Sequence, residues 1–132
     1  MDLDLFKRLC EVPGVPGREE RVRDLIEKEI SGGKKDSLFD EIRTDAMGSL
    51  ICTRRPTRSA KDRKSGKGRA TRVMVAAHMD EIGFYVRFVD DNGHLWLNPA
   101  GGFDPRNLFS RRVRVVTESG DLFGVMNPGG KP

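Results

Sequence analysis

An uninterrupted apolar run from Val73 to Ala77 constrains the fold more than any other stretch of this chain. A strand that faces water on one side carries a polar residue at every second position, and this run carries none. The pattern therefore predicts a strand that is covered on both faces, as in sheets with helices on either side. The sequence differs in character before and after this run, so the run also divides the chain into two halves.

The half before the run predicts two helices and two strands. Residues 1–12 carry apolar side chains at helical spacing, and Pro13 and Pro16 must end that helix. A second helix is expected from about Arg18, because apolar residues recur at helical intervals from Val22 and the sequence Ser31-Gly32-Gly33 ends it. Residues 39–44 and 48–53 are expected to form two short strands.

The half after the run predicts short strands separated by turns. Asp91-Asn92-Gly93 and Ser119-Gly120 are strong hairpin turns, because Asn and Gly tolerate positive φ. The expected fold class is therefore α/β in the front half, followed by an antiparallel, small-barrel β unit. The expected strands of this unit are 82–89, 94–97, 112–117 and 122–126.

The net charge of +4 comes from one segment, residues 54–72. This segment holds nine basic residues and one acid, and removing it from the chain's 24 basic and 20 acidic residues leaves 15 and 19. Its Ser, Gly, Pro, Lys and Arg leave almost nothing to bury, so a flexible loop is expected. Nucleic acid is not the expected partner, because the segment lacks aromatic residues that would stack on bases, although phosphate contacts alone could give salt-sensitive binding.

The composition also bears on the compartment. No apolar stretch approaches the roughly 18 residues that a membrane span needs. Charged residues interrupt the N-terminal twelve residues, which argues against a signal peptide. The two cysteines, Cys10 and Cys52, are isolated from each other and form no Cys-x-x-Cys motif. A reducing, cytoplasmic compartment is therefore expected.

The chemistry-bearing residues follow the apolar run directly. His78 lies where the predicted strand ends, and open α/β sheets place their active sites at such ends. A neutral imidazole is a good ligand for zinc or cobalt, and Asp80 would lie on the same side of an extended chain. Its carboxylate could accept the other ring N–H and fix the tautomer. On these residues alone His-x-Asp is a weak signal, because a single histidine at a strand end is more often structural than a metal ligand.

Several motifs in order resemble the glutamyl-aminopeptidase-like family of dinuclear metallo-aminopeptidases, the enzymes that assemble into tetrahedral particles. A helix runs into a small-residue turn and Glu, an Asp-x-x-Gly-x-Leu strand follows, and then come the His78 motif, a Gly-Gly-Phe-Asp-Pro turn and an Arg-Val-x-Val-x-Thr stretch. The resemblance covers nearly the whole chain except the basic segment. The matching segments are 14–20, 45–50, 78–84, 101–105 and 112–125.

The resemblance implies that the chain contains parts of two domains with different roles. Residues 1–83 would begin an α/β metallopeptidase catalytic domain, and residues 84–132 would form part of an inserted β-barrel-like dimerisation domain. His78 would bind one of two divalent metals, zinc or cobalt, and Asp80, counted as catalytic, would orient His78. The implied activity is removal of N-terminal residues from short peptides by metal-activated water. The implied partners are the peptide and further copies, which form dimers and then a larger shell.

Two further polar residues receive no catalytic role. Glu81 falls within the motif and is expected to be structural, and His94 follows a turn and is expected to be an exposed hairpin histidine. Asp80 and Glu81 would point apart in a strand, whereas a glycosidase needs two carboxylates that flank the scissile bond. The residues therefore disfavour a glucanase activity, a label that some family members have carried.

The chain also departs from the family. The family's remaining ligands are a bridging Asp, a Glu-Glu pair, a further carboxylate and a final His, and these 132 residues hold none of those segments. A dinuclear site generally needs three or more protein groups per ion. We therefore expect the N-terminal portion of an enzyme, inactive by itself and not retaining the metals. The alternatives are a catalytically dead interaction or dimerisation fragment and a small β-barrel nucleic-acid-binding protein that uses residues 54–72.

Overall fold

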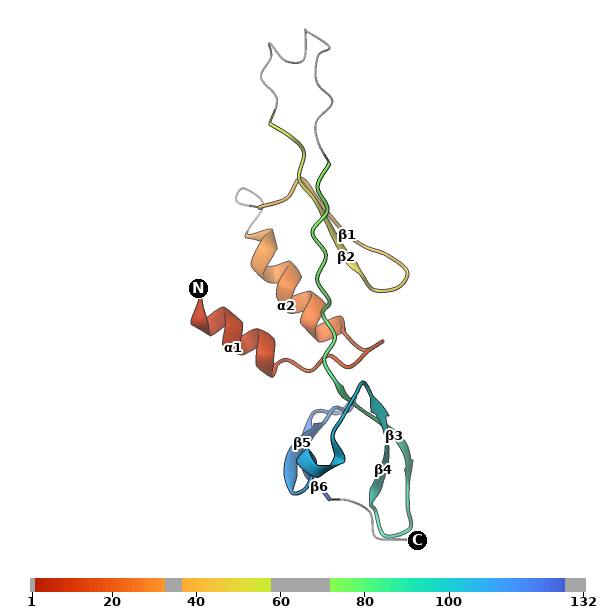
Figure 1. Ribbon diagram of the computed structural model, residues 1–132. Coiled ribbons are helices and arrows are strands. Elements are labelled where there is room, and N and C mark those ends of the chain that lie inside the picture. The colour runs from red at the N-terminus through yellow and green to blue at the C-terminus, as the bar shows by residue number, and fades with distance from the viewer. Residues whose placement is uncertain (1, 33–36, 58–71, 128–132) are drawn as a thin grey trace. The chain divides into compact units, whose positions relative to one another are not determined.

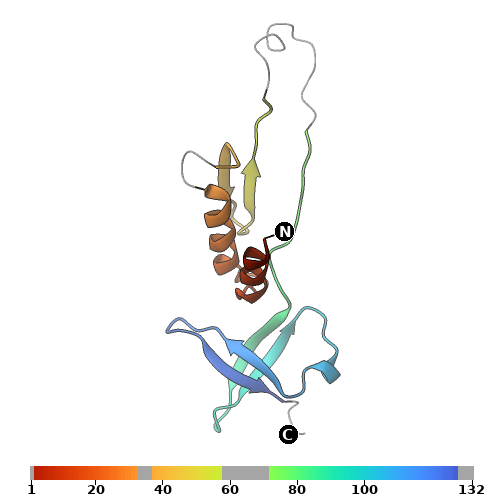
Figure 2. The ribbon, with the colours of Figure 1, turned by 90° about the vertical axis from the view of Figure 1, so that its left-hand side faces the viewer.

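A computed structural model describes residues 2–32, 37–57 and 72–127 (Figures 1 and 2). Within these ranges the protein is mixed α/β, with two α-helices and three two-stranded antiparallel sheets. The chain divides into two compact units, Met1–Asp80 and Glu81–Pro132. Most of the basic segment expected to be flexible, residues 58–71, lies outside the described residues.

The two predicted helices of the first unit are confirmed. α1 spans Leu3–Glu11, and the Asp2 side chain caps its start by accepting hydrogen bonds from the backbone N–H groups of Asp4 and Leu5, both at 3.0 Å. Val12, which precedes Pro13, is already extended and ends this helix. α2 spans Glu20–Ser31, and Gly32 caps its C-terminus in the left-handed conformation.

The helices are tied to each other and to the turn between them. Arg8 of α1 donates a 2.6 Å hydrogen bond to Glu29 of α2. Val22 of α2, at 5% exposure, is the buried apolar side chain of the described residues. It packs on Gly14, where an added Cβ would lie only 2.3 Å from Val22 Cγ2. Gly14 is therefore required by the close approach of the turn to α2.

A short hairpin completes the regular structure of the first unit. β1, Glu41–Thr44, pairs antiparallel with β2, Leu50–Thr53, as the sequence predicts. The Asp45 side chain accepts hydrogen bonds from the backbone N–H groups of Met47 and Ser49, both at 2.9 Å. These bonds, with that to Ser49 the stronger influence, lower the pKa of Asp45. The carboxylate thereby holds the tight turn between the strands.

The prediction of a covered strand over Val73–Ala77 is wrong for the described structure. This segment is extended but belongs to no sheet, and Val73, Met74 and Val75 are 82%, 90% and 90% exposed. It appears in Figure 1 as the long green trace of the first unit. The apolar run creates a demand for neighbours on both edges and both faces, and the other described segments supply none of them. A sequence pattern shows that a strand favours burial, but it does not show whether other segments of the structure cover that strand.

The second unit consists of two hairpins. β3, Gly83–Val89, pairs with β4, Leu95–Ala100, and β5, Arg111–Val115, pairs with β6, Leu122–Met126. A single 3-10 turn, Pro105–Asn107, lies between the hairpins in the sequence. The four predicted strands are confirmed, with shifted ends. The described strands of the two hairpins share no hydrogen-bonded ladder, so they form no closed barrel by themselves.

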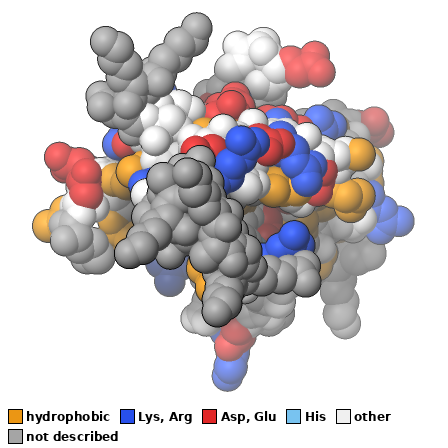
Figure 3. All heavy atoms as spheres, turned by 90° about the horizontal axis from the view of Figure 1, so that it is seen from above, with side chains coloured by type: hydrophobic (Ala, Val, Ile, Leu, Met, Phe, Trp, Pro, Cys, Tyr) orange, Lys and Arg blue, Asp and Glu red, His pale blue; other side chains and the backbone are white. Residues whose placement is uncertain are grey.

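Aromatic pairs stabilise the first of these hairpins. A bulge between Val86 and Phe88 shifts the register, so that Phe88 lies opposite Trp96. Their rings stack with centroids 5.5 Å apart, and Phe84 stacks on Phe103 at 4.4 Å. Charged side chains of both signs are interspersed over the face seen in Figure 3.

Candidate functional site

His78 and Asp80 lie at the end of the extended segment that follows residue 72. The Nδ1 atom of His78 is 3.0 Å from the backbone carbonyl oxygen of Asp80 and 3.2 Å from its Oδ1. The His78 side chain is 84% exposed, and that of Asp80 is 40% exposed. The structure thus brings these two predicted site residues together, with the imidazole facing solvent.

This contact determines what the imidazole can offer. In the tautomer that carries its hydrogen on Nδ1, His78 donates that hydrogen to the oxygen atoms of Asp80. The lone pair of Nε2 then remains available as a ligand. A histidine whose second nitrogen is held by a carboxylate or a carbonyl group is the usual arrangement at protein metal sites.

The donor set of the described residues is incomplete for a metal ion. In residues 2–32, 37–57 and 72–127, no three His, Cys, Asp or Glu side chains come together as a cation site. A catalytic zinc site takes about three protein ligands plus water. His78 therefore fits one coordination position, and no reaction step can be assigned to these residues alone.

The other two residues considered from the sequence lie in the second unit. Glu81 is exposed at the start of this unit. Among the described residues, the hydrogen-bond contacts of the His78 ring are with Asp80 and not with Glu81. His94 is 75% exposed in its side chain, with Nδ1 3.3 Å from Asp90 Oδ2. The expectation of an exposed hairpin histidine is confirmed.

Sequence reasoning gave no role to Asp90, which organises the β3–β4 turn. Its carboxylate accepts hydrogen bonds from the backbone of Asn92 at 3.0 Å, the backbone of His94 at 2.8 Å and the Trp96 indole at 3.1 Å. These bonds, led by that from the His94 backbone, lower the pKa of Asp90. An Asp that opens an Asx turn before Asn-Gly is the signal that could have identified it.

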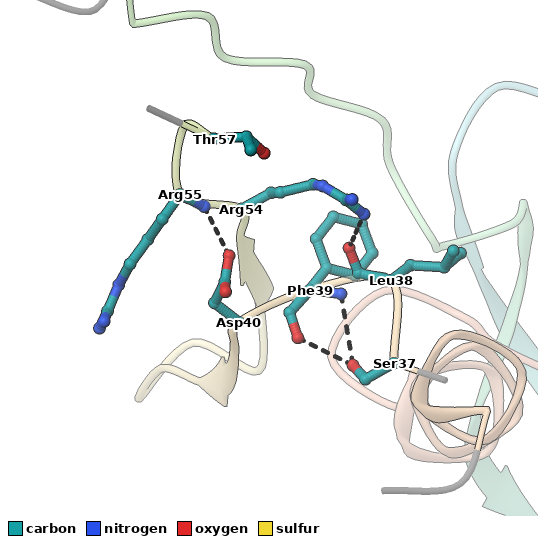
Figure 4. A pocket seen from close by; sticks show the side chains of 7 residues that line it. All are labelled: Ser37, Leu38, Phe39, Asp40, Arg54, Arg55 and Thr57. Carbon is teal, nitrogen blue, oxygen red and sulfur yellow. Dashed lines mark hydrogen bonds between the residues drawn. The ribbon is translucent and has the colours of Figure 1, made fainter. Parts of the chain in front are cut away.

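A shallow polar hollow lies where the chain enters β1 and leaves β2 (Figure 4). Arg54 donates a 2.6 Å hydrogen bond from Nη1 to the Leu38 carbonyl, and the Arg55 backbone N–H donates at 2.6 Å to Asp40. Both bonds join the two walls of the hollow to each other. These two hydrogen bonds hold the ends of the hairpin together, and this structural role explains the polar groups of the hollow.

No helix among the described residues is long and apolar enough to cross a membrane.

The sequence profile of the M42 glutamyl aminopeptidases matches residues 60–130, more than half of the chain. The chain belongs to this family. It is 37% identical over 127 residues to the lysyl aminopeptidase of Pyrococcus furiosus, covering 96% of this chain and 32% of that protein. It is 30% identical to the glutamyl aminopeptidase of Lactococcus lactis, covering 98% of this chain and 32% of that protein.

Solved structures agree with this membership. The TET1 peptidase of Pyrococcus horikoshii, described as assembling into a tetrahedron or a large octahedral shell, is 35% identical with a TM-score of 0.74. That match covers 98% of this M42 chain and 34% of the other. A Thermotoga maritima protein described as an endoglucanase is 36% identical with a TM-score of 0.71, and the match covers 92% and 33% of the two chains. This M42 chain thus spans about a third of the length of the relatives it matches.

Proposed function

We propose that this chain is the N-terminal portion of a metal-dependent aminopeptidase that removes N-terminal residues from short peptides. Membership of the M42 family supports the reaction class. The observation that carries the proposal is the pairing of His78 with Asp80, which leaves one imidazole nitrogen exposed at the end of an apolar segment inside the matched region.

The roles of the two residues follow from their contact. His78 would supply one ligand to one of two divalent metals, zinc or cobalt, and Asp80 would act by holding the ring in its ligand tautomer. When bound, such metals polarise the scissile carbonyl and lower the pKa of a bound water. The described residues supply one ligand, so this chain by itself is not expected to hydrolyse peptides.

The two compact units suggest how the proposed enzyme is organised. We assign residues 1–83 to the start of the catalytic domain and residues 84–132, with the two hairpins, to part of an inserted β-barrel-like domain used for dimerisation. Dimers would build a larger shell, an expectation that the described assembly of the Pyrococcus horikoshii relative supports. A cytoplasmic location is part of the same proposal.

A chimeric protein tests the proposed function directly. Residues 1–132 replace the matching region of the Pyrococcus furiosus lysyl aminopeptidase, and the chimera is assayed for metal content and for release of N-terminal residues from short peptides. We expect activity in the chimera and a loss of both metal and activity in its His78→Ala variant, because one ligand of the metal is removed.

The matched control is His94→Ala, which removes the chain's other histidine, also exposed, and should leave metal content and activity unchanged. A folded chimera that keeps full activity and metal after His78→Ala would refute the proposed role of this residue.

A further inference from the structure

The segment that carries His78 meets the rest of the first unit at the turn between α1 and α2. Residues 72–78 are exposed, whereas Met79 and Asp80 are half-buried. The Cβ position of Gly14, a buried residue of that turn, is 3.7 Å from the carbonyl oxygen of Met79. Among the described residues, no backbone hydrogen bond joins residues 78–80 to other parts of this unit, so packing holds them in place.

Met79 is the middle residue of the contact between His78 and Asp80. The imidazole Nδ1 reaches the carbonyl oxygen and the carboxylate of Asp80, so the backbone of Met79 sets how the two residues face each other. Contacts of 3.0 and 3.2 Å are near the outer limit of ordinary hydrogen bonds. A small shift of the Met79 peptide group therefore weakens them.

The Cβ position of Gly14 also lies against α2. An added Cβ would be 2.3 Å from Cγ2 of Val22, so the turn approaches α2 this closely only where the side chain is absent. Gly14 is not among the glycines of positive φ, so its requirement comes from space alone. Any displacement that relieves a clash with Val22 changes how the turn packs on Met79.

We propose that Gly14 is a positioning residue for the His78–Asp80 pair. The absence of a side chain at position 14 lets the turn pack on α2 and on Met79 together, and this packing holds the His78 ring in the tautomer that carries its hydrogen on Nδ1. The consequence for metal binding rests on the function proposed above. The packing belongs to this chain and is measurable without metal.

Nitrogen NMR spectra of the imidazole rings in the full chain test the proposal, because they distinguish hydrogen on Nδ1 from hydrogen on Nε2. At about pH 8, where imidazole is ordinarily neutral, we expect the Nδ1–H form of His78 in the wild type. Gly14→Ala should shift the His78 resonances toward the Nε2–H form. His94, whose Nδ1 contacts Asp90 in the second unit, is an internal control and should not change.

Two further variants separate positioning from a general loss of stability. Gly48→Ala strains the β1–β2 turn of the same unit, because Gly48 has φ of +87° and its added Cβ would lie 3.1 Å from Nη1 of Arg23. That Cβ has no contact with Met79, so the His78 tautomer should stay unchanged. Adding Val22→Ala to Gly14→Ala removes the clash and should restore the Nδ1–H form of His78.

The wild-type chain provides a test that needs no variant. Nuclear Overhauser effects should join the α-protons of Gly14 to protons of Met79 or Asp80, and their absence would overturn the proposal even if Gly14→Ala fails to fold. An unchanged His78 tautomer in folded Gly14→Ala would also overturn it, as would an equal change in Gly48→Ala. Far-UV circular dichroism establishes that each variant is folded.

The chimera separates this proposal from the proposed function. There, Gly14→Ala should lower zinc affinity by about 10- to 100-fold, the usual cost of disturbing a group that orients a ligand. If the tautomer responds to Gly14→Ala while His78→Ala leaves the metal content unchanged, the proposed function fails and the positioning role stands. If His78→Ala removes metal while Gly14→Ala changes neither tautomer nor affinity, the positioning role alone fails.

Discussion

Nδ1 of His78 lies 3.2 Å from Oδ1 of Asp80 and slightly closer to the carbonyl oxygen of the same residue. Two acceptors thus compete for one ring N–H, and only one of them can be removed by substitution. The carbonyl oxygen keeps part of the orienting contact when the carboxylate is lost. The pair therefore predicts a graded response, in contrast with the loss expected for a ligand itself.

Asp80→Ala should weaken metal binding by the assembled enzyme without abolishing it. Loss of a group that orients a ligand typically costs about 10- to 100-fold in metal affinity or activity. Titration of the active chimera with zinc would measure this, and Glu81→Ala provides a neighbouring carboxylate that His78 does not contact. Equal affinity in the wild type and Asp80→Ala would show that the carboxylate has no positioning role.

Part of the candidate site was predictable because its residues are neighbours in the sequence. A spacing of two in an extended chain places His78 and Asp80 on one side, and the structure has them in contact. The rest of a metal site is assembled from distant segments, and no local pattern predicts which distant groups converge. The role of Asp90 was not predicted, because the turn signal Asp91-Asn92-Gly93 begins one residue later and does not show which preceding side chain accepts its hydrogen bonds.

Gly14→Ala should destabilise the first unit. The new methyl group would lie 2.3 Å from Val22 Cγ2, so the turn and α2 must move apart. Overpacking of this kind costs about 1–3 kcal/mol of the free energy of unfolding. Urea denaturation followed by circular dichroism measures the cost. Adding Val22→Ala should recover part of it, because the clashing methyl groups are then absent.

The control for this prediction is Gly102→Ala, where an added Cβ meets nothing within 4 Å. If the two alanine variants unfold at the same urea concentration, the close packing of Gly14 on Val22 contributes nothing to stability.

Gly101→Ala should destabilise the second unit for two reasons that can be separated. Gly101 has φ of +102°, and its added Cβ would lie 2.6 Å from Ile82 Cγ2. Gly120 has φ of +127° with nothing within 4 Å, so its alanine variant reports backbone strain without the clash. The Gly101 variant should lose about 1–3 kcal/mol more than the Gly120 variant, the usual cost of overpacking.

Fluorescence of Trp96, the only tryptophan in the sequence, follows this unfolding in urea. Equal losses of unfolding free energy in both variants would show that the Ile82 side chain moves aside at no cost. Backbone strain alone would then explain the destabilisation.

Local sequence signals predicted much of the fold. They did not predict the features that depend on residues distant in the sequence. The strands of the second unit were predictable because Asn92-Gly93 and Ser119-Gly120 fix turns without reference to distant residues. The bulge between Val86 and Phe88 was not, because it depends on how Phe88 fits against Trp96. The apolar run at Val73–Ala77 predicted a covered strand that the described structure does not have, because a local pattern does not show which distant segments would cover it.

The β3–β4 hairpin should lose order in acid through Asp90. The hydrogen bonds to this carboxylate hold its pKa below the ordinary value of 3.8. A group with a depressed folded-state pKa stabilises the fold above its unfolded-state pKa, and this contribution disappears as the pH falls through the folded-state value. Because Asp90 accepts the Trp96 indole N–H, emission from Trp96 should change below about pH 4, near the ordinary titration range of aspartate.

Asp90→Asn should remove most of this acid transition, because the amide has no charge to neutralise, and its Trp96 emission should already resemble the acid form at neutral pH. Asp91→Asn is the matched control: it removes a neighbouring charge to which no described residue donates a hydrogen bond, and the transition should persist. An unchanged transition in Asp90→Asn would assign the acid response to other carboxylates of the chain, such as Asp104, whose pKa is lowered by its hydrogen bonds with Arg106.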